Sequence, residues 1–96
     1  MTYAFIRDVP IDETQYAEVR AAIGDDTPKG LIAHLVIRQD TGLRYIDVWD
    51  TEADWERFRD ERVNPVVTKM MVAHGITPPA TPLPLQTIDV IHAWVG

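Results

Sequence analysis

Alternation of hydrophobic and polar residues marks three short stretches of the chain, residues 3–9, 43–49 and 86–95. A period of two places successive side chains on opposite faces of a β-strand, so each stretch is predicted to be a strand. A fourth strand is predicted at residues 31–38, which are nearly all apolar except His34. That composition is typical of a strand that is covered on both faces.

Helical spacing of apolar residues separates the strands at 3–9 and 31–38. Asp12 followed by Gln15 resembles a capping box at the start of a helix, and Gly24 is placed to end it. The apolar face of this helix consists of Tyr16, Val19 and Ile23.

A second helical segment begins directly after residue 49. Thr51 and Asp54 have the spacing of an N-cap. We expect Asn64-Pro65 to re-cap this segment, with a kink or break, because proline cannot continue a helix but suits its first position. Gly75 ends the segment. The residues expected to face inward are Trp55, Phe58 and Arg62, then Val67, Met70 and His74.

The turn between the two central strands sets which side chains meet. A two-residue Thr41-Gly42 turn would hold β-branched Thr41 at positive φ, whereas a four-residue loop over residues 39–42 leaves only Gly42 there. The longer loop is therefore favoured. It pairs Arg38 with Leu43, Val36 with Tyr45 and His34 with Asp47. The shorter turn would place Asp47 diagonal to His34, so both turns put these two residues on one face within reach.

The element order β-α-β-β-α-β, with a hairpin in the middle, predicts an α+β protein of the ferredoxin-like type. Two helices can cover only one face of its four-stranded antiparallel sheet. The strands are apolar on both sides, so we expect a second copy of the chain to cover the other face, which predicts a homodimer. Residues 76–85 hold four prolines and are expected to form an extended connector to the last strand.

The two faces of the predicted sheet differ in chemistry. One is aliphatic, with Ala4, Ile6, Ala33, Leu35, Ile37, Ile46 and Val48. The other mixes aromatic and polar residues: Phe5, Arg7, His34, Val36, Arg38, Tyr45, Asp47 and Trp49. An apolar wall with a few polar groups suits a small-molecule pocket, so we expect the mixed face to line one and the aliphatic face to fill a barrel. The opposite assignment stays open.

His34 and Asp47 are the strongest catalytic candidates, because a carboxylate can fix the imidazole tautomer and make His34 a general base. The alternative is a purely structural His–Asp hydrogen bond. Arg7 could hold an anionic ligand or, with Tyr45, stabilise an enolate oxygen, or it could pair with an aspartate. Candidate substrate-binding residues are Phe5, Trp49 and His74, each of which could equally be core.

The composition of the chain disfavours several classes of function. The 96 residues carry a formal charge of −6, with 15 acidic against 9 basic side chains, which disfavours nucleic-acid binding. There is no cysteine, and the three histidines lack metal-ligand spacing, so neither a metal nor another cofactor is expected. The sequence shows no signal peptide and no apolar run long enough to span a membrane, and we expect a cytoplasmic protein.

The segment Asp47-Val48-Trp49-Asp50-Thr51-Glu52-Ala53-Asp54-Trp55 resembles a motif of the dimeric α+β barrel superfamily. That superfamily includes antibiotic-biosynthesis-monooxygenase-like proteins, small polyketide cyclases and heme-degrading monooxygenases. The resemblance covers the whole chain in element order and implies a homodimer with a pocket in each subunit. Heme-degrading members carry a helical Trp and a proximal His where this chain has Phe58 and Thr68, and His74 lies six residues further along. Heme degradation therefore ranks lower.

Together these features lead us to expect a cofactor-independent enzyme of the monooxygenase or cyclase/isomerase type that acts on an aromatic or polyketide-like compound. His34 would be its base, oriented by Asp47. The alternative is a non-catalytic ligand-binding or structural homodimer.

Overall fold

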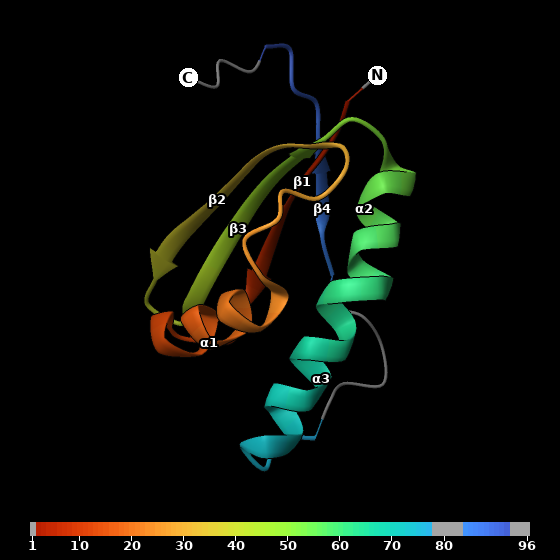
Figure 1. The fold of residues 1–96 in the computed structure, drawn as a ribbon. Coiled ribbons are helices and arrows are strands. Elements are labelled where there is room, and N and C mark those ends of the chain that lie inside the picture. The colour runs from red at the N-terminus through yellow and green to blue at the C-terminus, as the bar shows by residue number, and fades with distance from the viewer. Residues whose placement is uncertain (1, 78–83, 93–96) are drawn as a thin grey trace.

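The computed structural model describes residues 2–77 and 84–92 and shows an α+β fold (Figure 1). Its elements are β1 (Tyr3–Val9), α1 (Glu13–Ile23), β2 (Leu31–Gln39), β3 (Gly42–Trp49), α2 (Glu52–Phe58), the π-helical turn η1 (Arg59–Val63), α3 (Asn64–Ala73) and β4 (Gln86–Ile88). The four strands form one antiparallel sheet in the order β2-β3-β1-β4, which is compatible with the expected ferredoxin-like fold.

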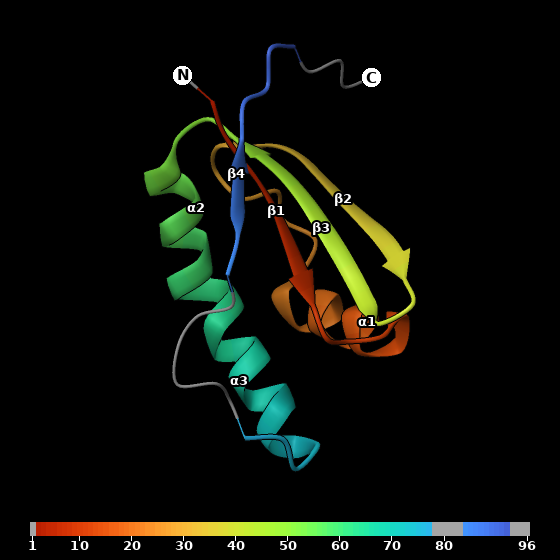
Figure 2. The ribbon, with the colours of Figure 1, turned by 180° about the vertical axis from the view of Figure 1, so that it is seen from behind.

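Helix α1 crosses the sheet on one face: it lies in front of the strands in Figure 1 and behind them in Figure 2. Its start matches the predicted capping box, because the Asp12 side chain accepts from the Gln15 backbone N–H while the Gln15 side chain accepts from that of Asp12. Its end at Gly24, with φ of 97°, is also as predicted. These two signals fix where Tyr16 projects from the helix.

The hairpin between β2 and β3 has the predicted register, with Arg38 opposite Leu43 and His34 opposite Asp47. The turn itself is shorter than expected, because Gln39 and Gly42 also pair and leave only residues 40–41 unpaired. Thr41 still avoids positive φ, and Gly42 takes it instead, with φ of 144°. A Cβ at Gly42 would lie 2.3 Å from the Val9 carbonyl oxygen, so this position requires glycine.

Only part of the expectation for Asn64-Pro65 is confirmed: α3 begins at Asn64 with Pro65 in its first turn, but Asn64 does not cap it. Asn64 has helical backbone angles, no side chain caps α3, and the chain passes from α2 through η1 into α3 without a break. The Asn64 N–H instead bonds to the Arg59 carbonyl, five residues back. A π-helical turn before Pro65 widens the helix where the ring would otherwise crowd the preceding turn, so the irregularity is absorbed without a new cap.

The last strand is shorter than the predicted range of residues 86–95. β4 pairs with β1 only from Gln86 to Ile88, which faces Ala4. β1 itself begins at Tyr3, so its ladder offers little backbone beyond that point, and residues 89–92 are not in a strand. Residues 93–95, and residues 78–83 of the predicted connector, lie outside the described part of the chain.

The hydrophobic core lies between the sheet and α2. Phe5, Trp49 and Trp55 are its buried centre, with ring centroids 4.8 Å apart for Phe5 and Trp55 and 5.7 Å apart for Trp49 and Trp55. Leu31 packs against this cluster because a β-bulge between Leu31 and Ala33 returns it to the helix-facing side, opposite Trp49.

The aliphatic face of the sheet points away from the helices. Some of its members are buried, as Ala4 and Val48 are, but Leu35 and Ile37 on the edge strand β2 are 57% and 43% exposed. The sheet therefore presents apolar side chains on the side that no helix covers.

Candidate functional site

A cavity of about 530 Å³ lies between the sheet and the helices. This volume is in the range of small-molecule sites. The mixed face of the sheet supplies Arg7, His34, Tyr45, Asp47 and Trp49 to its wall, and α1 supplies Tyr16. The cavity thus opens on the face that the sequence analysis assigned to a pocket.

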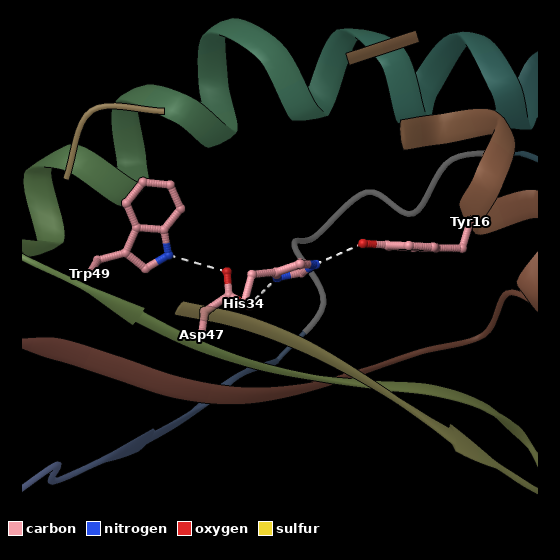
Figure 3. A network of polar contacts seen from close by, with 4 residues as sticks. All are labelled: Tyr16, His34, Asp47 and Trp49. Carbon is pink, nitrogen blue, oxygen red and sulfur yellow. Dashed lines mark hydrogen bonds and ion pairs between the residues drawn. The ribbon is translucent and has the colours of Figure 1, made fainter. Parts of the chain in front are cut away.

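A chain of hydrogen bonds runs through this wall from helix to sheet (Figure 3). The Tyr16 hydroxyl lies 2.9 Å from His34 Nε2, and His34 Nδ1 lies 2.6 Å from Asp47 Oδ1. The second carboxylate oxygen of Asp47 accepts from Trp49 Nε1 at 3.1 Å. Four side chains from α1, β2 and β3 are therefore joined in one network.

The partners of the imidazole determine where its proton lies. An ionised carboxylate can only accept, so Nδ1–H of His34 donates to Asp47. In the neutral ring Nε2 is then the acceptor, and the Tyr16 hydroxyl donates to it. This arrangement leaves His34 able to take one more proton on Nε2, which is the state that a general base needs.

Asp47 is buried, with only 4% of its surface exposed. Each of its two oxygens has a donor, one from His34 and one from Trp49. A buried carboxylate that lacked such donors would be costly, so these two bonds hold the group in place and aim it at the imidazole. Alternation along β3 accounts for this geometry, because Tyr45, Asp47 and Trp49 project from the same face.

The Tyr45 ring packs against two members of the network. Tyr45 meets Tyr16 and His34 edge-on, with centroids 5.7 Å and 5.3 Å away. Burial raises the pKa of Tyr45 to about 12, and burial also raises the pKa of Tyr16. Both phenols are therefore protonated at neutral pH: Tyr16 donates its hydrogen bond to His34 Nε2, and Tyr45 can donate one into the cavity.

Arg7 lies beside these rings. Its guanidinium carbon is 5.7 Å from the centre of the Tyr45 ring and 5.6 Å from that of Trp55. Burial lowers the pKa of Arg7, and the nearby Tyr45 and Asp47 oppose that shift. Its Nε atom is buried and has no hydrogen-bond partner among the residues that the structure describes.

The structure brings five of the predicted site residues together at the cavity: Arg7, His34, Tyr45, Asp47 and Trp49. Phe5 does not line the cavity; it lies in the buried core with Trp49 and Trp55. His74 lies on the surface at the end of α3, where Nε2 is 3.1 Å from Oε2 of Glu18, and it does not line the cavity.

Tyr16 and Trp55 also line the cavity. Their spacing in the sequence predicted only that they lie on the inward faces of helices. The same apolar spacing that predicts a core face also marks residues that can border a pocket. One signal could have identified Tyr16 as a site residue. It lies on the inward face of the first helix, and that face packs against a sheet that carries His34.

No cluster of three or more His, Asp or Glu side chains suited to a metal ion occurs within residues 2–77 and 84–92. In the same part of the chain, none of the helices combines the length and hydropathy that crossing a membrane requires. Comparison with protein-family models and with curated proteins finds no match to this chain.

Proposed function

We propose that this protein is a cofactor-independent enzyme that removes a proton from an aromatic or polyketide-like compound. The observation that carries the proposal is the Tyr16–His34–Asp47 chain on the wall of a cavity of small-molecule size. A base oriented by a buried carboxylate and placed beside aromatic side chains suits the abstraction of a proton next to a carbonyl.

Tyr16 and His34 both line the cavity, and the Tyr16 hydroxyl occupies the Nε2 side of the imidazole, which suggests how the proton moves. As the ligand gives a proton to the Tyr16 oxygen, the Tyr16 proton passes to His34 Nε2. Tyr16 ends unchanged, His34 becomes an imidazolium paired with Asp47, and the ligand becomes an enolate. Tyr45 donates a hydrogen bond to the enolate oxygen, and the nearby positive charge of Arg7 adds to this stabilisation.

Two reaction types share this first step. In a cyclase or isomerase, His34 returns the proton through Tyr16 to another atom of the ligand. In a monooxygenase, the enolate reacts with O₂, and a CH₂ group and one O₂ give a carbonyl and one water. The proposal covers the common step, and oxygen consumption distinguishes the two outcomes.

The proposal includes a homodimer of the dimeric α+β barrel type. Two features support it: the sequence motif from Asp47 to Trp55, and the exposed Leu35 and Ile37 on the sheet face opposite the helices. Two such faces packed together would remove these side chains from water.

The test uses 2-tetralone, a bicyclic ketone with a fused benzene ring and acidic CH₂ groups, as the probe. Exchange of its α-hydrogens in D₂O is followed by NMR with wild-type protein and with His34→Gln and Tyr16→Phe. We expect wild-type protein to accelerate exchange and each variant to lose roughly 10²-fold of that acceleration, the scale of general base catalysis. An oxygen electrode then shows whether O₂ is consumed.

Asp40→Asn, an exposed change in the turn between β2 and β3 at a residue that does not line the cavity, is the matched control and keeps the acceleration. Exchange that is equally fast in wild-type protein and in His34→Gln contradicts the proposal. Saturable binding of 2-tetralone without any acceleration supports the ligand-binding alternative instead.

A further inference from the structure

Arg7 is a half-buried cation without a hydrogen-bonded counter-ion. No hydrogen bond or ion pair joins its guanidinium to another of the described residues, and its Nε is buried. A guanidinium carries five N–H donors and no acceptor, so burial of Nε–H without a partner leaves a strong donor unsatisfied. The group faces a cavity, so a ligand is the natural source of acceptors.

The carboxylate that acts electrostatically on Arg7 is already engaged. Asp47 contributes to the electrostatic environment of Arg7, but its two oxygens accept from His34 and Trp49. When His34 gains a proton, Asp47 is balanced by the imidazolium and Arg7 is left as an excess positive charge. Asp25 and Asp26 also line the cavity, but both are exposed on the loop after α1, where water screens them.

The surroundings of Arg7 define the shape of its partner. Tyr45 and Trp55 flank the guanidinium, whereas the nearby Arg59 is already paired with Asp60. Aromatic walls favour a flat, apolar ligand body, whereas the guanidinium matches a planar group with two oxygens.

We propose that the ligand of this cavity is an aromatic carboxylate whose carboxylate binds the Arg7 guanidinium while its ring lies against the aromatic wall. This inference rests on the proposed function, because it names the substrate class for the same cavity. This role of Arg7 differs from stabilisation of the enolate. A permanent carboxylate on the ligand accepts hydrogen bonds from the guanidinium as soon as the ligand binds, before any proton moves.

The experiment compares two probes of nearly equal shape, 2-naphthoate and neutral 2-naphthamide, by isothermal titration calorimetry. We expect wild-type protein to bind the carboxylate about tenfold more tightly than the amide, as one additional charge-assisted contact allows. Arg7→Met removes the charge but keeps the apolar stem, and is expected to bind both probes equally. Arg7→Lys restores part of the preference, because it keeps the charge but loses the planar geometry.

His34→Gln separates this inference from the proposed function. It is expected to keep the preference for 2-naphthoate while losing proton exchange. Equal affinity of wild-type protein for the two probes overturns the inference without requiring any variant to fold. An equal loss of affinity for both probes in a folded Arg7→Met protein also overturns the inference, because Arg7 then acts only in packing.

Discussion

Asp47 controls the protonation of the site because its two hydrogen-bond partners, Trp49 and His34, differ in their capacity to donate and accept hydrogen bonds. The indole N–H of Trp49 can only donate, whereas each nitrogen of His34 can donate or accept according to its tautomer. The carboxylate satisfies both, since it accepts from Trp49 and from His34 Nδ1. The state of Nε2, and with it the direction of the Tyr16 hydrogen bond, therefore follows from the charge of Asp47.

Asp47→Asn tests this control without a substrate. Its amide oxygen must face Trp49, so its NH₂ group faces His34 Nδ1, which then has to accept. The ring proton is expected to move to Nε2, where it donates to Tyr16. Long-range ¹H–¹⁵N correlation spectra of His34 report which nitrogen is protonated, with His34→Gln to identify the signals. A proton that stays on Nδ1 in Asp47→Asn contradicts this account.

Tyr45 gives a second test at residue scale. Its pKa is raised by burial to about 12 from the ordinary 10.0, so the unfolded chain loses this proton at lower pH than the native protein does. The free energy of unfolding therefore falls as pH rises from 10.0 to about 12. In Tyr45→Phe the fall should be shallower, as measured by urea unfolding across this range.

Tyr3→Phe is the comparison for Tyr45→Phe, because burial also raises the pKa of Tyr3, which lies at the other end of the β1–β3 ladder. We expect the larger effect for Tyr45. An identical pH dependence in wild-type protein and Tyr45→Phe would show that the buried phenol does not control alkaline stability.

At the scale of the elements, the sequence predicts the parts that depend on local chemistry. The capping box at Asp12, Gly24 after α1 and the N-cap at Thr51 are all observed, because each depends on a few neighbouring residues. The strand register was predictable because it depends on where positive φ is allowed, and it correctly placed His34 opposite Asp47.

The unpredicted features depend on contacts between elements. The bulge at Leu31–Ala33 turns Leu31 toward the Phe5–Trp49–Trp55 core, which strand alternation alone does not show. β4 stops at Ile88, where its ladder with β1 ends, although its own pattern continues. Tyr16 joins the site because α1 crosses the sheet over β2, a placement set by packing rather than by helical spacing.

Asp12 offers a test of how an element supports the site. Asp12→Ala removes the cap of α1 and should lower the free energy of unfolding by about 1 kcal/mol. Tyr16 lies in the first turn of the helix, with its N–H on the Asp12 carbonyl, so fraying there should also weaken its bond to His34. Urea unfolding measures the loss of stability, and hydrogen exchange of the Tyr16 amide measures the fraying of this turn.

Asp12→Asn is the matched control, because asparagine caps as well as aspartate and changes only the charge. It should unfold within a few tenths of a kcal/mol of wild-type protein, since the lost charge at the helix N-terminus is exposed. Equal destabilisation by Asp12→Asn and Asp12→Ala would attribute the effect to charge rather than to the capping hydrogen bond.

At the scale of the whole molecule, the two sides of the sheet have different environments. The helix side encloses the core and the cavity, while the opposite side exposes Leu35 and Ile37 on an edge strand. Exposed apolar side chains on a sheet edge favour association with another chain. The net charge of −6 keeps copies apart at long range, so the association should strengthen as salt screens that charge.

The last prediction tests the homodimer at this face. Wild-type protein should elute with a light-scattering mass near twice 10.9 kDa. Leu35→Lys places a charge in the proposed interface and should shift the population to monomer, with the circular dichroism spectrum unchanged. Val72→Lys on α3 is the matched control, because Val72 is equally apolar and 63% exposed but lies on a helix. It should remain dimeric. A monomeric wild-type protein, or equal dissociation by both substitutions, would mean that this sheet face does not hold two copies together.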